Sequence, residues 1–302
     1  MSALTLARSL PPFAERWLAL VERAVTGASA WDRSECHPEA DDRHRTTPPM
    51  PHTCATLHTA PYSATRRTIG RDWPTHGFTM VGHVRLRNIR EQLERVCAQG
   101  VPGSFAELGV WRGGASLYAR AVLEALGERA TGRRVHLFDA FGALRGYGLA
   151  RNYLSVPLRE VELAFEKFDL MSDAVRFHPG LFNESLPRFG RQVLPPPIAV
   201  LRIDGNFYES YTTALYHLWD SVPLGGAIIF DDFAATAAVP ASTTGPRAAW
   251  EDFKREHALR EQLRPVDWTS SYVIKETGTR VAWGRYDAAR RRKRGKDLFG
   301  RA

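Results

Sequence analysis

The sequence predicts an α/β protein built on a doubly wound, mostly parallel β-sheet. Three short apolar segments each end in aspartate, namely Val135–Asp139, Ile198–Asp204 and Gly226–Asp232. Stretches with apolar residues at helical spacing separate them, and strands alternating with helices are typical of parallel sheets. Because open α/β folds bind ligands at the carboxyl ends of their strands, these aspartates are expected to meet in one site.

An N-terminal helical arm precedes this α/β region. Apolar residues recur at helical spacing over Phe13–Val25, after the Pro11-Pro12 start. From Trp31 to about Pro61 the composition changes to His, Thr, Pro, Asp and Arg, which is typical of a linker or lid. We therefore expect an arm with a flexible linker over residues 1–65, a folded domain over 66–284 and a tail over 285–302.

Within the folded domain the expected elements alternate. A helix over Val84–Gln99 ends at Gly100, a usual capping residue. A strand over Ser104–Val110 leads through a glycine-rich turn into a helix over Ala115–Leu126. Later helices are expected near Arg159–Phe168, Tyr211–Val222 and Ala248–Leu259, and the candidates for an antiparallel edge are Tyr272–Ile274 and Arg280–Trp283.

The positive charge is concentrated in the tail. The 302 residues carry a net charge of +8, yet Arg285–Ala302 alone holds eight Lys or Arg against two Asp, a net of +6. A terminal run of like charge is usually solvated and disordered, although it also permits binding to RNA or an anionic surface. Because the body of the chain is nearly balanced, nucleic acid is not the expected partner.

Cysteine usage and hydropathy favour a cytoplasmic protein without a membrane span. The three cysteines, Cys36, Cys54 and Cys97, are odd in number and lack Cys-x-x-Cys spacing, which argues against a disulfide framework or a structural zinc site. The N-terminal leucines soon meet Pro11, so no continuous signal-peptide core forms. No stretch reaches the roughly 20 apolar residues that a membrane span needs.

Glu107 and the glycines after it are the first candidate site. Glycines at Gly109 and Gly113 let the backbone approach a ligand, but the spacing differs from the Gly-x-Gly-x-x-Gly of dinucleotide sites. A carboxylate here suits an ammonium group better than a pyrophosphate, which favours S-adenosylmethionine. The alternative is a capping turn without catalytic meaning.

Asp139 ends the next strand of the sequence. We expect it either to accept hydrogen bonds from ribose hydroxyls or to be an exposed turn residue. Phe141, just after it, would either stack on the adenosine or belong to the core.

Asp204, Asp231 and Asp232 form the second candidate site. Oxygen ligands on neighbouring strand ends suit a hard divalent ion such as Mg²⁺, which would acidify and hold an acceptor alcohol. Without an ion, Asp231 and Asp232 would merely cap the next segment.

Several motifs together resemble the macrocin O-methyltransferase family of antibiotic tailoring enzymes. They span about residues 70–283, and their order and combination are specific. The matching segments are Arg71–Pro74, Phe78–Gly82, Arg85–Asn88, Val101–Gly103, Glu107–Gly114, Asp139–Gly142, Val175–Gly180, Leu201–Ser210 and Gly225–Asp232.

The resemblance implies a class I, Rossmann-like methyltransferase domain over 66–284. It implies transfer of a methyl group from S-adenosylmethionine to a hydroxyl, with Mg²⁺, on a deoxysugar of a glycosylated secondary metabolite; a homo-oligomer is compatible with this reading. The residues that it places around the methyl donor are Thr79, Met80, Glu107, Gly109, Trp111, Asp139, Ala140 and Phe141. It makes Asp204, Asp231 and Asp232 the metal ligands, with Asp204 also the candidate general base.

Three departures from the family pattern bear on substrate choice. Asn206 stands where the family usually has a second acid, Ala140 replaces a usual Ser, and the segment after Gly142 is short. Because that segment helps to cover the acceptor in the family, the substrate is expected to differ. The alternatives are a catechol-type phenol O-methyltransferase, a non-catalytic nucleic-acid-binding protein that uses the basic tail, and a dehydrogenase, which the missing dinucleotide fingerprint disfavours.

Overall fold

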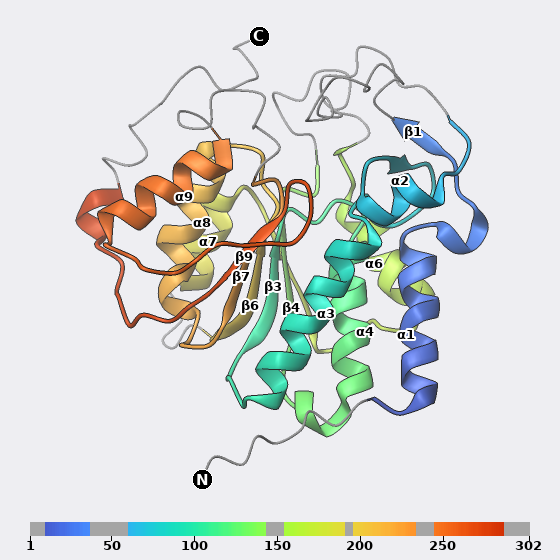
Figure 1. The fold of residues 1–302 in the computed structure, drawn as a ribbon, viewed down its shortest axis with the longest axis horizontal. Helices are drawn as coiled ribbons and strands as arrows, with labels where there is room; N and C mark the ends of the chain where they lie inside the picture. Colours follow the sequence, from blue (N-terminus) through green and yellow to red (C-terminus); the bar gives the residue numbers. More distant parts are fainter. Residues whose placement is uncertain (1–9, 37–59, 143–153, 191–195, 234–244, 287–302) are drawn as a thin grey trace.

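A seven-stranded sheet forms the centre of the protein. The computed structural model describes residues 10–36, 60–142, 154–190, 196–233 and 245–286. Strand order in the sheet is β5-β4-β3-β6-β7-β9-β8 (Figure 1). The strands are β3 Ser104–Leu108, β4 Val135–Asp139, β5 Val175–Pro179, β6 Ile198–Ile203, β7 Ala227–Phe230, β8 Arg264–Pro265 and β9 Ser271–Ile274. Strands β3 to β7 are parallel, and β9 runs antiparallel to both β7 and β8.

Helices cover both faces of the sheet (Figure 1). One face carries α1 Pro12–Val25, α3 His83–Ala98, α4 Gly114–Leu126 and α6 Leu158–Lys167. The other carries α7 Phe182–Gly190, α8 Tyr208–Leu218 and α9 Gly245–Glu256. Short elements complete the described chain: α2 Ala64–Ile69, the antiparallel pair β1 Ser34–Cys36 and β2 Trp73–Pro74, and 3₁₀ turns at Ala28–Ala30, Gly127–Ala130, Trp219–Ser221 and Trp283–Arg285. Each face has its own hydrophobic cluster, so the α/β class and the doubly wound, mostly parallel sheet predicted from the sequence are confirmed.

The strand order reverses between β3 and β6. From β3 the chain moves outward to β4 and β5, and it then returns to the other side of β3 to form β6 and β7. The carboxyl ends of strands diverge at such a switch point and leave a crevice for ligands. This reversal places the ends of β3 and β6 at the centre of the ligand-binding edge.

Helix α1, the N-terminal arm, packs against the helices that cover one face of the sheet. Helix α1 begins at Pro12, where a proline is tolerated because the first amide of a helix lacks an internal partner. It lies against α4 and buries Leu18, Val21 and Val25. The separation into units 1–65, 66–284 and 285–302 stays a prediction. Most of the expected lid and tail, residues 37–59 and 287–302, lies outside the described residues.

The expected strand over Arg280–Trp283 is wrong. The amides of Val281 and Ala282 donate to Asp220 Oδ1 at 3.2 Å and to His257 Nε2 at 3.0 Å, and Trp283 begins a 3₁₀ turn, so this segment pairs with none of the described strands. The edge is instead the two-residue β8, whose Pro265 is tolerated because an edge strand can lack one amide donor. Among the described helices, none has both the length and the apolar character needed to cross a membrane.

Candidate active site

One pocket opens over the carboxyl ends of the central strands. Its lining includes nine residues predicted from the sequence: Thr79, Met80, Glu107, Gly109, Trp111, Asp139, Asp204, Asp231 and Asp232. The two other predicted residues, Ala140 and Phe141, follow Asp139 but do not line this pocket. The pocket thus brings together side chains from four strand ends and from the loop before α3.

Gly109 allows β3 and β6 to meet closely. Its φ of 90° lies in the left-handed region, and a Cβ atom here would be 2.1 Å from the carbonyl oxygen of Asp204. The Asp204 amide donates to the Leu108 carbonyl at 2.7 Å, which fixes the two strand ends side by side. A side chain at position 109 would therefore push the ends of β3 and β6 apart.

Glu107 is buried and already has partners within the protein. Its carboxylate accepts a hydrogen bond from Ser116 Oγ and pairs with the guanidinium of Arg202. Burial raises the pKa of Glu107 to about 7, although Arg202 and Ser116 act in the opposite direction. A ligand ammonium that reaches Glu107 would share this carboxylate with Arg202.

Asp139 holds the turn that follows β3. Its carboxylate accepts hydrogen bonds from the amides of Val110 at 2.7 Å, Phe141 at 2.9 Å and Trp111 at 3.4 Å. Burial raises the pKa of Asp139, and these amides oppose that rise. Trp111 has a φ of 50°, and the guanidinium of Arg112 lies 4.3 Å from its ring centroid. Asp139 is thus anchored by backbone amides and keeps the turn in place.

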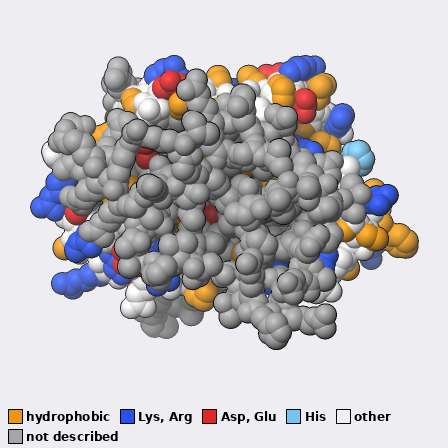
Figure 2. Space-filling model, turned by 90° about the horizontal axis from the view of Figure 1, so that it is seen from above, with side chains coloured by type: hydrophobic (Ala, Val, Ile, Leu, Met, Phe, Trp, Pro, Cys, Tyr) orange, Lys and Arg blue, Asp and Glu red, His pale blue; other side chains and the backbone are white. Residues whose placement is uncertain are grey.

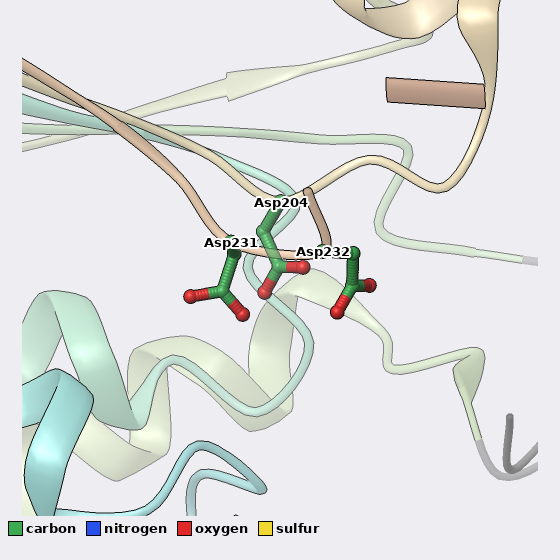
Figure 3. A group of neighbouring side chains, drawn as sticks. All are labelled: Asp204, Asp231 and Asp232. Carbon is green, nitrogen blue, oxygen red and sulfur yellow. The ribbon is translucent and has the colours of Figure 1, made fainter. Parts of the chain in front are cut away.

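Asp204, Asp231 and Asp232 converge on one point. Figure 3 shows the three carboxylates side by side, one from the end of β6 and two from the end of β7. One oxygen from each lies within 4.8 Å of the others. The predicted cluster therefore exists in space as well as in sequence.

Two buried arginines contact this cluster. Arg202 Nη2 lies 2.9 Å from Asp204 Oδ2 and 2.8 Å from Asp231 Oδ1. Arg85, on α3, approaches Asp231 Oδ2 at 2.7 Å through Nη1 and Asp267 Oδ2 at 2.7 Å through Nε. Within the described parts of the chain, Asp232 makes no ion pair. Arg202 also contacts Glu107, so one guanidinium joins the two groups of acids.

The cluster holds more negative charge than these arginines neutralise. Burial opposes ionisation of Asp231, but Arg202 and Arg85 hold its pKa below the usual value. In contrast, burial and the neighbouring carboxylates raise the pKa of Asp232 well above its usual range and that of Asp204 to about 6. A hard divalent cation would reverse these two shifts, and carboxylate oxygens are the ligands it prefers. The residues present therefore fit such an ion.

Arg85 and Arg202 were not predicted from the sequence as parts of the site. Arg202 carried a usable signal, because an arginine inside the apolar segment Ile198–Asp204 must be paired when that strand is buried. Arg85 carried none, since nothing in the helix sequence separates it from Arg87, whose side chain is 65% exposed. Trp73 and Trp268 also line the pocket without having been predicted to do so.

Comparison with known proteins identifies the family. The sequence model of the family Macrocin-O-methyltransferase (TylF) matches residues 14–275 of this chain. The chain belongs to the macrocin-O-methyltransferase family. The family recognised from the sequence is thereby confirmed, and the protein is an O-methyltransferase.

Individual relatives support the assignment. A tetracenomycin-C 4'-O-methyltransferase of Streptomyces olivaceus, whose full name specifies a dimethoxy-rhamnosyl substrate, is 38% identical over 68% of this chain and 78% of its own length. Mycinamicin III 3''-O-methyltransferase of Micromonospora griseorubida is 31% identical over 73% of this chain and 87% of its own.

The fold agrees with solved structures of O-methyltransferases. The O-methyltransferase NovP superposes with a TM-score of 0.70 and 29% identity, covering 87% of this chain and 100% of its own. The calicheamicin methyltransferase CalS11, at 19% identity and a TM-score of 0.52, shares the fold over 64% of this chain and 79% of its own. The predicted class I methyltransferase fold is thereby confirmed.

Proposed function

We propose that this macrocin-family enzyme transfers a methyl group from S-adenosylmethionine to a sugar hydroxyl of a glycosylated secondary metabolite, with Mg²⁺ as the metal. One observation carries the proposal: Glu107 and the Asp204, Asp231 and Asp232 cluster line the same pocket and are joined by Arg202. The name of one relative supports the acceptor class, since it specifies a dimethoxy-rhamnosyl group on tetracenomycin C.

The ends of β3 and β4 form the proposed donor half of the pocket. Glu107 accepts the donor's ammonium group, and Thr79, Met80, Gly109 and Trp111 line the same half. A carboxylate offers about four acceptor positions, so Asp139 can bind ribose hydroxyls in addition to its backbone amides. Ala140 and Phe141 follow Asp139 at the border of this half, where we expect them to contact the adenosine.

The ends of β6 and β7 form the proposed metal half. Mg²⁺ held by Asp204, Asp231 and Asp232 would lower the pKa of the acceptor hydroxyl and stabilise its ionised form. Asp204 is the candidate base, because it lines the pocket and its side chain is 25% exposed. The acceptor oxygen attacks the methyl carbon as the carbon–sulfur bond breaks, and the proton passes to Asp204. The protein mainly aligns the oxygen, carbon and sulfur in line.

Mass spectrometry of acceptor panels tests this function. The protein is incubated with S-adenosylmethionine, Mg²⁺ and either glycosides with vicinal sugar hydroxyls or catechols, with a chelator in parallel. We expect one added methyl group on glycosides and loss of the product with chelator. Methylation of catechols alone would overturn the acceptor class, and full activity in chelator would overturn the metal. A cytoplasmic location and a homo-oligomer stay predictions.

A further inference from the structure

The end of the N-terminal arm contacts the loop that lines the donor half of the pocket. The carbonyl oxygen of Val25, the last residue of α1, accepts hydrogen bonds from the amides of Phe78 at 2.7 Å and Thr79 at 3.1 Å. Thr79 and the next residue, Met80, line the pocket. The arm therefore contacts the backbone of Thr79, a residue that we place around the methyl donor.

Asp32 adds a charged anchor to the same loop. Its Oδ2 atom accepts hydrogen bonds from the amides of both His76 and Gly77, each at 2.7 Å. Gly27, with a φ of 74°, makes room for this carboxylate, because a Cβ atom there would lie 2.8 Å from Asp32 Oδ2. Buried Arg67 donates to the Asp32 carbonyl at 3.0 Å and pairs with Asp72, which fixes the Asp32 backbone. The residue is buried, with 6% of its surface exposed.

The opposite side of the loop contacts the turn after β3. Arg112 Nη1 donates to the carbonyls of Thr75 at 2.9 Å and Gly77 at 3.0 Å, and the Gly114 amide donates to the Phe78 carbonyl at 2.8 Å. The loop thus lies between the arm and the turn that carries Gly109 and Trp111. A shift of the loop would change both walls of the donor half.

We propose that Asp32 is a positioning residue for donor binding, an inference that rests on the proposed function. Its carboxylate orders two consecutive amides and so sets the backbone that presents Thr79 and Met80. Without it, the loop would sample more conformations, and the donor would have to order the loop when it binds. Because hydrogen bonds from amides to a carboxylate are stronger than those to a neutral acceptor, aspartate suits this position better than asparagine.

Calorimetric titration with S-adenosylhomocysteine tests the role in the full chain. We expect Asp32→Ala to weaken binding by about tenfold and Asp32→Asn by about threefold, since the amide still accepts but without charge. The matched control is Glu15→Ala, which removes another carboxylate of the arm. Glu15 lies near the start of α1, at the end away from the loop, and its Oε1 atom is 2.6 Å from Arg90 Nη2 of α3. Glu15→Ala should leave the dissociation constant within about twofold, because exposed ion pairs contribute little.

Hydrogen exchange separates positioning from a general loss of stability. The amides of residues 76–79 should exchange faster in both Asp32 variants, while those in β3 and α4 keep their wild-type protection. If Asp32→Ala does not fold, the asparagine variant carries the test. Unchanged binding in the Asp32 variants, or equal weakening in Glu15→Ala, would overturn the positioning role. Failure of the wild type to bind S-adenosylhomocysteine would instead overturn the donor site, and this role with it.

Discussion

The two halves of the pocket use carboxylates differently. In the donor half, Glu107 and Asp139 are held by partners from the protein, namely Arg202, Ser116 and three backbone amides. In the metal half, Asp232 has no ion pair among the described residues, and crowding with burial raises its pKa. The donor half is thus organised by the chain itself, whereas the Mg²⁺ that we propose would supply the positive charge that the metal half lacks.

The largest effect is expected in the metal half. Asp204→Ala removes a proposed ligand and the candidate base, so kcat should fall by about a thousandfold or more. Donor affinity should change by less than about threefold, because Arg202 keeps its contacts with Glu107 and Asp231. Steady-state kinetics and donor titration measure the two quantities. The exposed Asp173→Ala variant serves as a control. If Asp204→Ala lost donor affinity but kept its turnover, the assignment of one half to the donor and the other to the metal would have to be reversed.

The donor half should show the opposite pattern. Glu107→Gln keeps an acceptor for Ser116 but removes the charge that we assign to the donor's ammonium. Loss of one charge-assisted hydrogen bond should weaken S-adenosylmethionine binding by roughly 10- to 100-fold. At saturating donor, kcat should fall much less than in Asp204→Ala. Equal donor affinity in the variant and the wild type would show that Glu107 serves only to neutralise Arg202.

These two halves differ in how far the sequence could predict them. The strand-end acids were predictable, because an apolar run that stops at aspartate places the acid at a known edge of the sheet. Whether an acid is already neutralised was not predictable, since Arg85 and Arg202 are 117 residues apart and meet at Asp231 only through tertiary packing. The positions of the acids could therefore be predicted from the sequence, but the arginines that neutralise them could not.

The arm shows the same limit. Apolar spacing predicted the helix at Phe13–Val25, and the structure has α1 at Pro12–Val25. Its effect on the pocket depends on backbone atoms, since the Val25 carbonyl receives the Phe78 and Thr79 amides. Hydrogen bonds between backbone atoms of distant segments do not depend on the residue types involved, so the sequence does not reveal them. Strand β5, at Val175–Pro179, was not predicted as a strand, and its segment entered only as a match to the family pattern.

A smaller effect is expected from adding Mg²⁺ to the protein. An ion that binds only the folded state at ten times its dissociation constant should stabilise it by about 1.4 kcal/mol. The melting temperature should therefore rise by a few degrees, roughly 2–4 °C. Calorimetry of the wild type and of Asp232→Asn measures this rise, which should be lost in the variant. If Mg²⁺ raised the melting temperature equally in both proteins, the ion would bind away from Asp232, and the proposed contrast between a donor half and a metal half would be wrong.

The smallest effect concerns the strands that support the donor half. His136 Nδ1 lies 3.0 Å from His178 Nε2 across β4 and β5, next to the strand end that carries Asp139. Burial lowers the pKa of His136 to about 3 and that of His178 to about 4. Both rings are thus neutral in the folded protein at neutral pH, whereas an unfolded histidine gains a proton below about pH 6.5.

This difference fixes the sign of the pH dependence. The lowered pKa values contribute stability above pH 6.5 that is lost as the pH falls towards 4, by about 1 kcal/mol per histidine per pH unit at first. His178→Phe keeps a ring against Phe138, whose centroid lies 4.2 Å away, and removes one titrating group. Urea denaturation at pH 7 and at pH 6 should therefore show a fall in unfolding free energy that is smaller in the variant, by less than about 1 kcal/mol. The raised pKa values of Asp204 and Asp232 act in the opposite direction, because proton uptake by the folded state adds stability as the pH falls, and they are present in both proteins. An equally steep fall in both proteins would mean that His178 does not cause the acid sensitivity, and would contradict a donor half stabilised by neutral histidines.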